Sequence, residues 1–271
     1  MKNLLSLSIL VTLTFPFSTH AASSYMQNFN GYANDTTDLS DGTVIASDSG
    51  SASIQNNALR LSFYEQSGEI GNFRIPGLSG SAAGWTASFT VSLSSPDAPA
   101  DGFSFSWGSG IPLLIPVNDP DEISVGGSEE GWGVEVDHVY FSFDPLDNGD
   151  NEWGLAIGGA DGLNTYTFAN MPGQLAGAEQ NINAEVFISW DPIHGASFRT
   201  TGFNTNIDVS NILTPGITAA DSNVFAFASR TGALTQTLLI DNLNIQSVPE
   251  PSAVLLSGLG GLLLVRRRRS I

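Results

Sequence analysis

Apolar and polar residues alternate with a period of two along much of this chain. From 85 to 93 every odd position is apolar and every even position carries a hydroxyl, and residues 103–107 repeat the pattern. A period of two is the spacing of side chains on one face of a β-strand, whereas a helix repeats every 3.6 residues. The pattern therefore predicts β-strands that each place one face in a core.

Turn-forming residues separate these predicted strands. The chain has 29 Gly and 13 Pro, and Asp191 to Gly195 has the composition of a hairpin turn. Without βαβ units or sustained helical periodicity, this favours an all-β, two-sheet antiparallel sandwich formed by one domain, residues 23–247. Residues 144–177 are the least regular part, and we expect long loops there. The expected core side chains are Trp85, Phe89, Phe103, Phe105, Val134, Val136, Ile188, Phe225, Phe227 and Ile240.

The first 22 residues have the composition of a secretory signal peptide. Lys2 supplies a positive charge, residues 4–17 are almost entirely apolar, and small residues allow cleavage after Ala21 or Ala22. The apolar run is shorter than the roughly 20 residues of a membrane-spanning helix. We therefore expect export, with residues 1–22 forming a helical signal segment that is removed.

The last segment, residues 248–271, has three parts in order. Pro249, Glu250 and Pro251 precede an apolar stretch over 253–265. The basic cluster that follows consists of Arg266, Arg267, Arg268 and Arg269. This order resembles the PEP-CTERM sorting signal of exopolysaccharide-producing Gram-negative bacteria, which implies cleavage by an exosortase-type processing enzyme. An ordinary single-pass anchor is the alternative.

The charge of this segment predicts its orientation. Arginines beside an apolar helix stay on the cytoplasmic side, so the preceding domain is held outside. We expect a transmembrane helix that anchors the precursor in the inner membrane, before the protein reaches the cell surface or the exterior. The apolar stretch is short for a span, and snorkelling arginine stems make up the difference.

The charge of the central domain excludes one class of partner. The whole chain carries −18, and leaving out Lys2, Glu250 and the four terminal arginines removes a net +4, so the domain carries −22. Nucleic-acid binding needs a basic surface, and we expect no nucleic acid as a partner. An acidic exported protein instead suits divalent cations, calcium above all. The chain has no Cys, so packing alone stabilises the domain.

Three segments of the domain resemble the concanavalin A-like jelly roll of legume-type lectins, laminin-G-like modules and several glucanases. Residues 100–105 read Ala-Asp-Gly-Phe-Ser-Phe, residues 134–137 read Val-Glu-Val-Asp, and residues 225–232 are followed by Ile-Asp-Asn-Leu at 240–243. Their order matches three strands of that fold. The resemblance covers about residues 25–247 and implies a jelly roll with a lectin-like function.

The lectin resemblance implies a sugar site. In legume-type lectins the Asp of the first motif accepts hydrogen bonds from sugar hydroxyls, which places Asp101 as a sugar ligand. A carboxylate can accept two neighbouring hydroxyls at once. The turn at Gly126 and Gly127 offers backbone N–H groups to the same sugar, or is a plain flexible loop.

The same resemblance implies a metal site on the second motif. Glu135 and Asp137 are two residues apart on a predicted strand, so both carboxylates share a face and call for a cation or a raised pKa. The family pattern breaks at Phe141, where a ligating Asn is expected. Five later residues can supply oxygen ligands for calcium instead: Asp144, Asp147, Asn148, Asp150 and Glu152. A merely solvated acidic face is the alternative.

The glucanases of this fold use a Glu-x-Asp-x-x-Glu strand, in which two Glu carboxyls act as nucleophile and acid. Here Tyr140 stands in place of the second Glu, and a phenol with a pKa near 10 is a poor proton donor. We therefore expect no enzyme. The sequence predicts a surface-sorted carbohydrate-binding protein associated with exopolysaccharide, or alternatively a structural or adhesive matrix protein without a sugar site.

Overall fold

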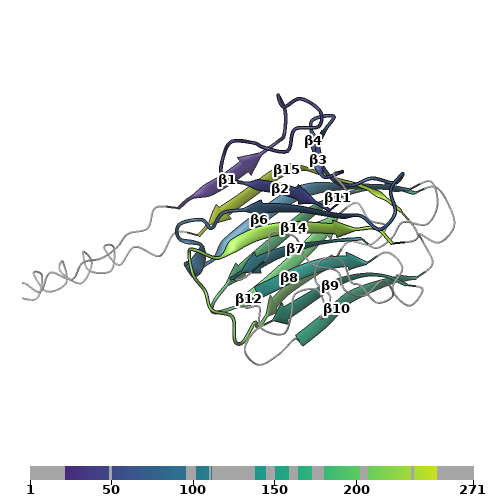
Figure 1. Ribbon diagram of the computed structural model, residues 1–271. Helices are drawn as coiled ribbons and strands as arrows, with labels where there is room; N and C mark the ends of the chain where they lie inside the picture. The colour runs from purple at the N-terminus through teal and green to yellow at the C-terminus, as the bar shows by residue number, and fades with distance from the viewer. Residues whose placement is uncertain are drawn as a thin grey trace, which may run out of the picture. The chain divides into compact units, whose positions relative to one another are not determined.

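The predicted strands assemble into two antiparallel sheets that pack face to face (Figure 1). Sheet A has eight strands: β13 (Ile207–Ile212), β12 (Gly195–Thr201), β11 (Gln180–Asp191), β6 (Trp85–Ser95), β15 (Thr237–Ser247), β4 (Ala58–Ser62) and β3 (Ser53–Gln55) in spatial order, with β1 (Ser24–Gln27) also on β15. Sheet B has seven: β10 (Asn164–Pro172), β9 (Asp150–Gly158), β8 (His138–Asp144), β7 (Phe103–Gly108), β14 (Val224–Arg230), β5 (Ile70–Ile75) and β2 (Val44–Ser47). A single 3-10 turn, η1 (Ser81–Ala83), precedes β6.

The computed structural model describes residues 22–48, 51–95, 102–109, 111, 138–144, 150–158, 164–172, 180–201, 207–232 and 235–248. For the strands between 138 and 182 it describes the backbone alone. Residues 21–249 form one compact unit. No helix within the described ranges is long and apolar enough to cross a membrane. The expected signal and anchor segments fall outside those ranges, apart from residues 22 and 248.

The all-β sandwich predicted from the alternating pattern is confirmed. Along β6 every odd position is buried, and the positions between are partly or fully exposed. The described members of the predicted core are at most 3% exposed. Val134 and Val136 lie outside the described residues. The hairpin between β11 and β12 also forms as expected, with Asp191 paired to Gly195.

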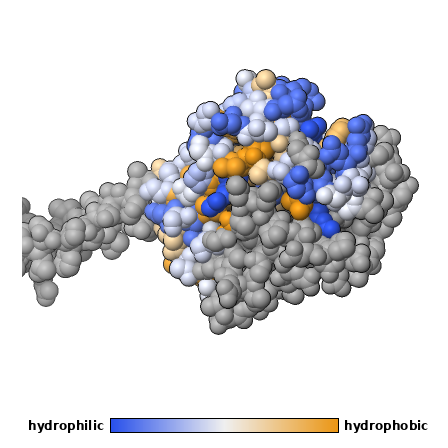
Figure 2. Space-filling view, viewed as in Figure 1, coloured by the Kyte–Doolittle hydropathy of each residue, from blue (hydrophilic) through white to orange (hydrophobic). Residues whose placement is uncertain are grey.

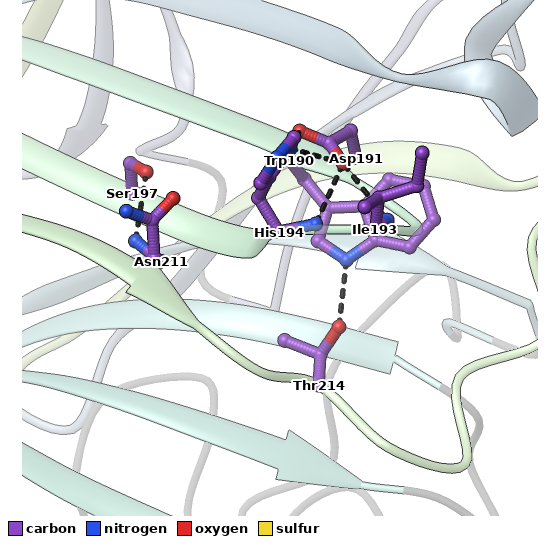
Figure 3. A network of polar contacts seen from close by, with 7 residues as sticks. All are labelled: Trp190, Asp191, Ile193, His194, Ser197, Asn211 and Thr214. Carbon is purple, nitrogen blue, oxygen red and sulfur yellow. Dashed lines mark hydrogen bonds and ion pairs between the residues drawn. The ribbon is translucent and has the colours of Figure 1, made fainter.

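Aromatic rings from both sheets fill the space between them. Phe89 of sheet A meets Phe227 of sheet B edge to face, with ring centroids 4.9 Å apart. Trp107 of sheet B lies 4.5 Å from Trp190 of sheet A. The indole N–H of Trp190 donates a 2.8 Å hydrogen bond to Thr214 (Figure 3). Edge-to-face and tilted contacts are the geometries that aromatic pairs prefer, so these rings fix the distance between the sheets.

One expectation about strands was wrong. Residues 144–177 do not consist mainly of loops, because β9 and β10 run through them and pair with each other. Gly, Asn and Asp lower the local strand propensity there, but pairing with neighbouring strands overrides it. On β7 both faces are buried, since Ser104 and Ser106 on the polar face are at most 1% exposed.

The two ends of the sandwich are called the terminal end and the loop end. At the terminal end β1 begins and β15 finishes, and the N–H groups of Ser23 and Ser247 both donate hydrogen bonds across this pair. Val248 continues the contact by donating to the carbonyl of Gly84. At the loop end, β6 and β14 finish and β7, β5 and β15 begin. Both chain ends of the described domain therefore leave from the end opposite the loops.

Candidate functional site

The loop end brings together parts of sheet B that carry predicted site residues. β7 begins at Phe103, directly after the Asp-Gly pair, and Phe103 is the register partner of Phe143 near the end of β8. Asp144 closes β8, and Asp150 opens β9. Although far apart in the sequence, these strand ends are neighbours in one sheet. The antiparallel topology therefore places the start of β7 and the acidic ends of β8 and β9 on one edge.

Gly102 is held in place by two buried side chains. Its carbonyl oxygen accepts a 2.8 Å hydrogen bond from the side-chain amide of Gln236 and lies 3.1 Å from the hydroxyl of Ser229. Gln236 is fully buried and Ser229 is 1% exposed. Gly102 has φ 82°, a left-handed conformation that glycine adopts without steric cost. The peptide between Gly102 and Phe103, one residue beyond Asp101, is thus fixed from the protein interior.

A second group of hydrogen bonds ties the neighbouring loops together. The backbone of Phe63 donates to the carboxylate of Glu69 at 2.8 Å, and the N–H of Glu69 donates to the hydroxyl of Thr231 at 3.0 Å. The hydroxyl of Thr231 in turn donates to the carbonyl of Gln66. Glu69 and Thr231 are both fully buried. The loop before β5 and the loop after β14 therefore form one ordered unit.

Sequence reasoning missed the polar atoms on the outer face of sheet B. Asn72, Ala228 and Ser104 are register partners on β5, β14 and β7, on the face that points away from the aromatic core. Asn72 is 3% exposed and Ser104 fully buried, and their side chains have no hydrogen-bond partner within the described part of the chain. The same holds for Ser106. The signal in the sequence is the set of small residues that β7 and β14 place next to each other on this face: Ser104, Ser106, Ala226 and Ala228.

Most of the predicted site residues lie outside the described residues. This applies to Asp101, Gly126, Gly127, Glu135, Asp137 and Asp147, and to the sorting residues Pro249, Glu250, Pro251, Arg266, Arg267, Arg268 and Arg269. The backbones of Asp144 and Asp150 are described, and Asp144 is the register partner of Glu152. In the residues that the structure describes, no group of three His, Cys, Asp or Glu side chains can hold a metal ion.

Comparisons with known proteins show what this chain is similar to. Residues 247–269 match the model of the PEP-CTERM protein-sorting motif. The chain carries this motif. No curated protein sequence matches the chain.

The fold is that of the legume lectins, a concanavalin A-like jelly roll. Lectin II from Ulex europaeus superposes with a TM-score of 0.57 at 13% identity, covering 85% of this chain and all of the lectin. Peanut lectin, solved with a 9mer peptide, gives 0.57 at 15% identity, covering 86% of this chain and 100% of its own. The exoplasmic/lumenal domain of VIP36, bound to Ca2+ and Man3GlcNAc, gives 0.54 at 10% identity, covering 83% and 91%.

The described surface of the domain is mainly polar. On the face seen in Figure 2, hydrophobic colour is confined to a few separate areas among hydrophilic ones. Large exposed apolar patches mark protein or membrane contacts, and small separate areas do not.

Proposed function

We propose that this protein is an exported, surface-sorted, non-catalytic carbohydrate-binding protein whose sugar site lies at the loop end. The observation that carries the proposal is the double hydrogen bonding of Gly102 by Gln236 and Ser229. A recognition residue needs a rigid support, because ordering it on binding costs affinity. Asp101 precedes this fixed peptide and is the proposed acceptor of two sugar hydroxyls, with Gly126 and Gly127 donating from their backbone.

The direction of β15 supports a display role for this site. β15 has 11 residues and runs from the loop end to the terminal end. At about 3.3 Å per residue it separates the two ends by about 35 Å. The sorting motif begins where β15 finishes, so the chain leaves the domain toward this motif from the end opposite the proposed sugar site.

A calcium ion is the second part of the proposal. Asp144 is the register partner of Glu152, so two acidic positions are neighbours in the ladder where β8 ends and β9 begins. With Asp150 beside them, and with Glu135, Asp137 and Asp147 from the segments that flank β8, these oxygens suit calcium.

The proposed partners follow from the sorting motif and the fold together. An exosortase-type enzyme processes residues 248–271, and the exported domain binds polysaccharide, with the producer's own exopolysaccharide as the expected ligand. The acidic surface favours neutral glycans over polyanions, because the domain carries −22. We propose no hydrolysis of the ligand, because Tyr140 stands where the glucanase motif has the Glu that acts as the catalytic acid.

Glycan-array binding of the full chain tests the sugar site. Asp101→Ala removes the proposed hydroxyl acceptor. Asp38→Ala is the matched control, since it removes an exposed carboxylate between β1 and β2 that accepts a hydrogen bond from the N–H of Ser40. We expect Asp101→Ala alone to reduce binding at least tenfold with an unchanged melting temperature. Equal binding by both variants would contradict the site. Absence of glycan binding by the parent chain would favour a structural or adhesive matrix role.

A further inference from the structure

The outer face of sheet A carries a shallow hollow that the proposed sugar site does not use. It has a volume of about 460 Å³ and lies over β6, β11, β12, β13 and β15. Ligand sites commonly measure about 300–1,000 Å³. It faces outward, because the alternate residues of the same strands, such as Ile188 and Phe198, are buried between the sheets. The loop end and this hollow are therefore separate surfaces of the domain.

A straight row of side chains crosses the floor of the hollow. The register makes each of them the partner of the next, from β13 through β12, β11 and β6 to β15. In that order the row is Asp208, Arg199, Phe187, Ser88 and Asn244. Neighbouring strands lie about 4.8 Å apart, so the row spans about 19 Å. Such a length accommodates several sugar units rather than one.

The two central members of the row form a platform. The guanidinium carbon of Arg199 lies 4.3 Å from the centroid of the Phe187 ring. Arg199 is exposed, so its N–H groups face solvent while the ring holds the guanidinium flat. A stacked arginine loses less freedom when a ligand binds than a free one does. The platform is therefore a preorganised set of hydrogen-bond donors.

Acceptors and amides surround this platform. Asp208, exposed beside Arg199, supplies a carboxylate. The side-chain amide of Gln246 donates to the Oδ1 atom of Asn244 at 3.2 Å, which leaves the amide N–H groups of Asn244 and the carbonyl oxygen of Gln246 for a ligand. Ser197 adds a hydroxyl that accepts a bond from the backbone of Asn211 (Figure 3). Donors and acceptors thus alternate over a short distance.

We propose that this hollow is a second saccharide-binding site, which holds a segment of a neutral polysaccharide chain across sheet A. Vicinal hydroxyls of a neutral sugar donate and accept at once, which matches the mixture of carboxylate, guanidinium, amide and hydroxyl groups. An acidic polysaccharide is disfavoured as the ligand, because the domain carries a net charge of −22 and a single arginine lines the hollow. A second copy of the chain is disfavoured as the occupant, because the face is polar and both copies carry the same charge.

Variants of the full chain separate this site from the loop end. Arg199→Ala and Phe187→Ala remove the platform. Arg60→Ala is the matched control, since Arg60 also stacks on a phenylalanine of this domain, 4.8 Å from the ring centroid of Phe63, but outside the hollow. The probes are dextran, galactomannan and alginate, each cast into a native gel, with retardation measured against a gel without polysaccharide.

We expect a neutral polysaccharide to retard the parent chain. Both platform variants should bind it with an apparent affinity at least fivefold lower, whereas Arg60→Ala should keep the affinity of the parent chain. Asp101→Ala tests the other site, and the variant that combines it with Arg199→Ala loses more than either change alone. Three results would overturn the second site. They are loss of retardation with Asp101→Ala only, retardation of the parent chain by alginate only, and no retardation of the parent chain by any of the polysaccharides. A dimer of the parent chain that Arg199→Ala dissociates in sedimentation would also overturn it. Loss with Arg199→Ala only would support it and contradict the loop-end site.

Discussion

The side-chain amide of Gln236 donates a 2.8 Å hydrogen bond to the carbonyl oxygen of Gly102, from a position 134 residues away in the chain. This bond joins the start of β15 to the peptide before β7. Gln236 is fully buried, so neither partner exchanges the bond for water. The contact connects the stability of the loop end to the placement of Asp101.

Gln236→Ala should lower both stability and glycan binding. Losing a buried hydrogen bond and leaving the Gly102 carbonyl with fewer donors costs about 1–3 kcal/mol. Urea unfolding measures the stability, and the glycan array measures the binding. Gln66→Ala, which changes an exposed glutamine of the loop before β5, is the control and leaves stability within about 0.5 kcal/mol. Unchanged binding in a destabilised Gln236→Ala would show that Gly102 does not position Asp101.

Gly71→Ala should destabilise the domain through a backbone clash. A Cβ atom at Gly71, on β5 of sheet B, would lie 1.8 Å from the carbonyl oxygen of Leu61, on β4 of sheet A. Backbone atoms on both sides cannot move away, and we expect a loss of about 3 kcal/mol or more in the free energy of unfolding. Urea titration monitored by tryptophan fluorescence measures it.

Gly31→Ala is the matched control for that clash. Gly31 has φ 89° and open space around it, so the substitution carries only the left-handed backbone strain of about 1–2 kcal/mol. Equal losses for Gly31→Ala and Gly71→Ala would refute the close approach of the two sheets at Leu61.

Asp191 should make the β11–β12 turn sensitive to acid. Its carboxylate accepts 2.8 Å hydrogen bonds from the backbone N–H groups of Ile193 and His194, and lies 3.0 Å from the His194 ring (Figure 3). Partial burial by itself would raise the pKa of Asp191, but these donors outweigh it and lower the pKa. A lowered folded-state pKa stabilises the fold above the unfolded value of about 3.9, and this stability is lost as pH falls through the folded pKa.

Asp191→Asn keeps an acceptor but removes the charge. At pH 7 the parent chain should be more stable than Asp191→Asn by at most about 1 kcal/mol, since the carboxylate is partly exposed and screened. The difference should shrink as the pH falls below about 4. Thermal melts between pH 7 and pH 3 measure it. A constant difference over that range would mean that Asp191 does not contribute to the acid sensitivity.

Chelation should destabilise the protein if calcium binds between β8 and β9. A ligand that binds only the folded state adds about 2.7 kcal/mol at one hundred times its dissociation constant. For a domain of this size that corresponds to a rise of about 5–10 °C in the melting temperature. Melts with calcium and with excess chelator measure the difference, and Asp137→Asn should remove most of it.

A calcium effect that survives Asp137→Asn would place the ion in the later 144–152 segment, without the second motif. Magnesium in place of calcium is the control for general screening, because its smaller ion demands a stricter geometry. Identical melts with and without chelator at low ionic strength would refute the metal site and leave the acidic residues as a solvated face.

Local sequence determined the strands and their buried faces. The alternation in β6 and the large aromatic residues of β14 both favour a core, so Trp85, Phe89, Phe225 and Phe227 could be placed there without a structure. The turn at Asp191 was equally local, because the side chain bonds to N–H groups two and three residues away. The jelly roll followed from motifs within single strands.

Only the tertiary structure decided what crosses between strands. The alternation in β7 shows which face is apolar, but the polar face at Ser104 is buried as well, and the sequence of a strand does not say what covers it. The contact of Gln236 with Gly102 and the row from Asp208 to Asn244 likewise join residues that no local pattern connects. Strand order and register set these neighbours, and a shift of one residue would turn every side chain in the row to the opposite face.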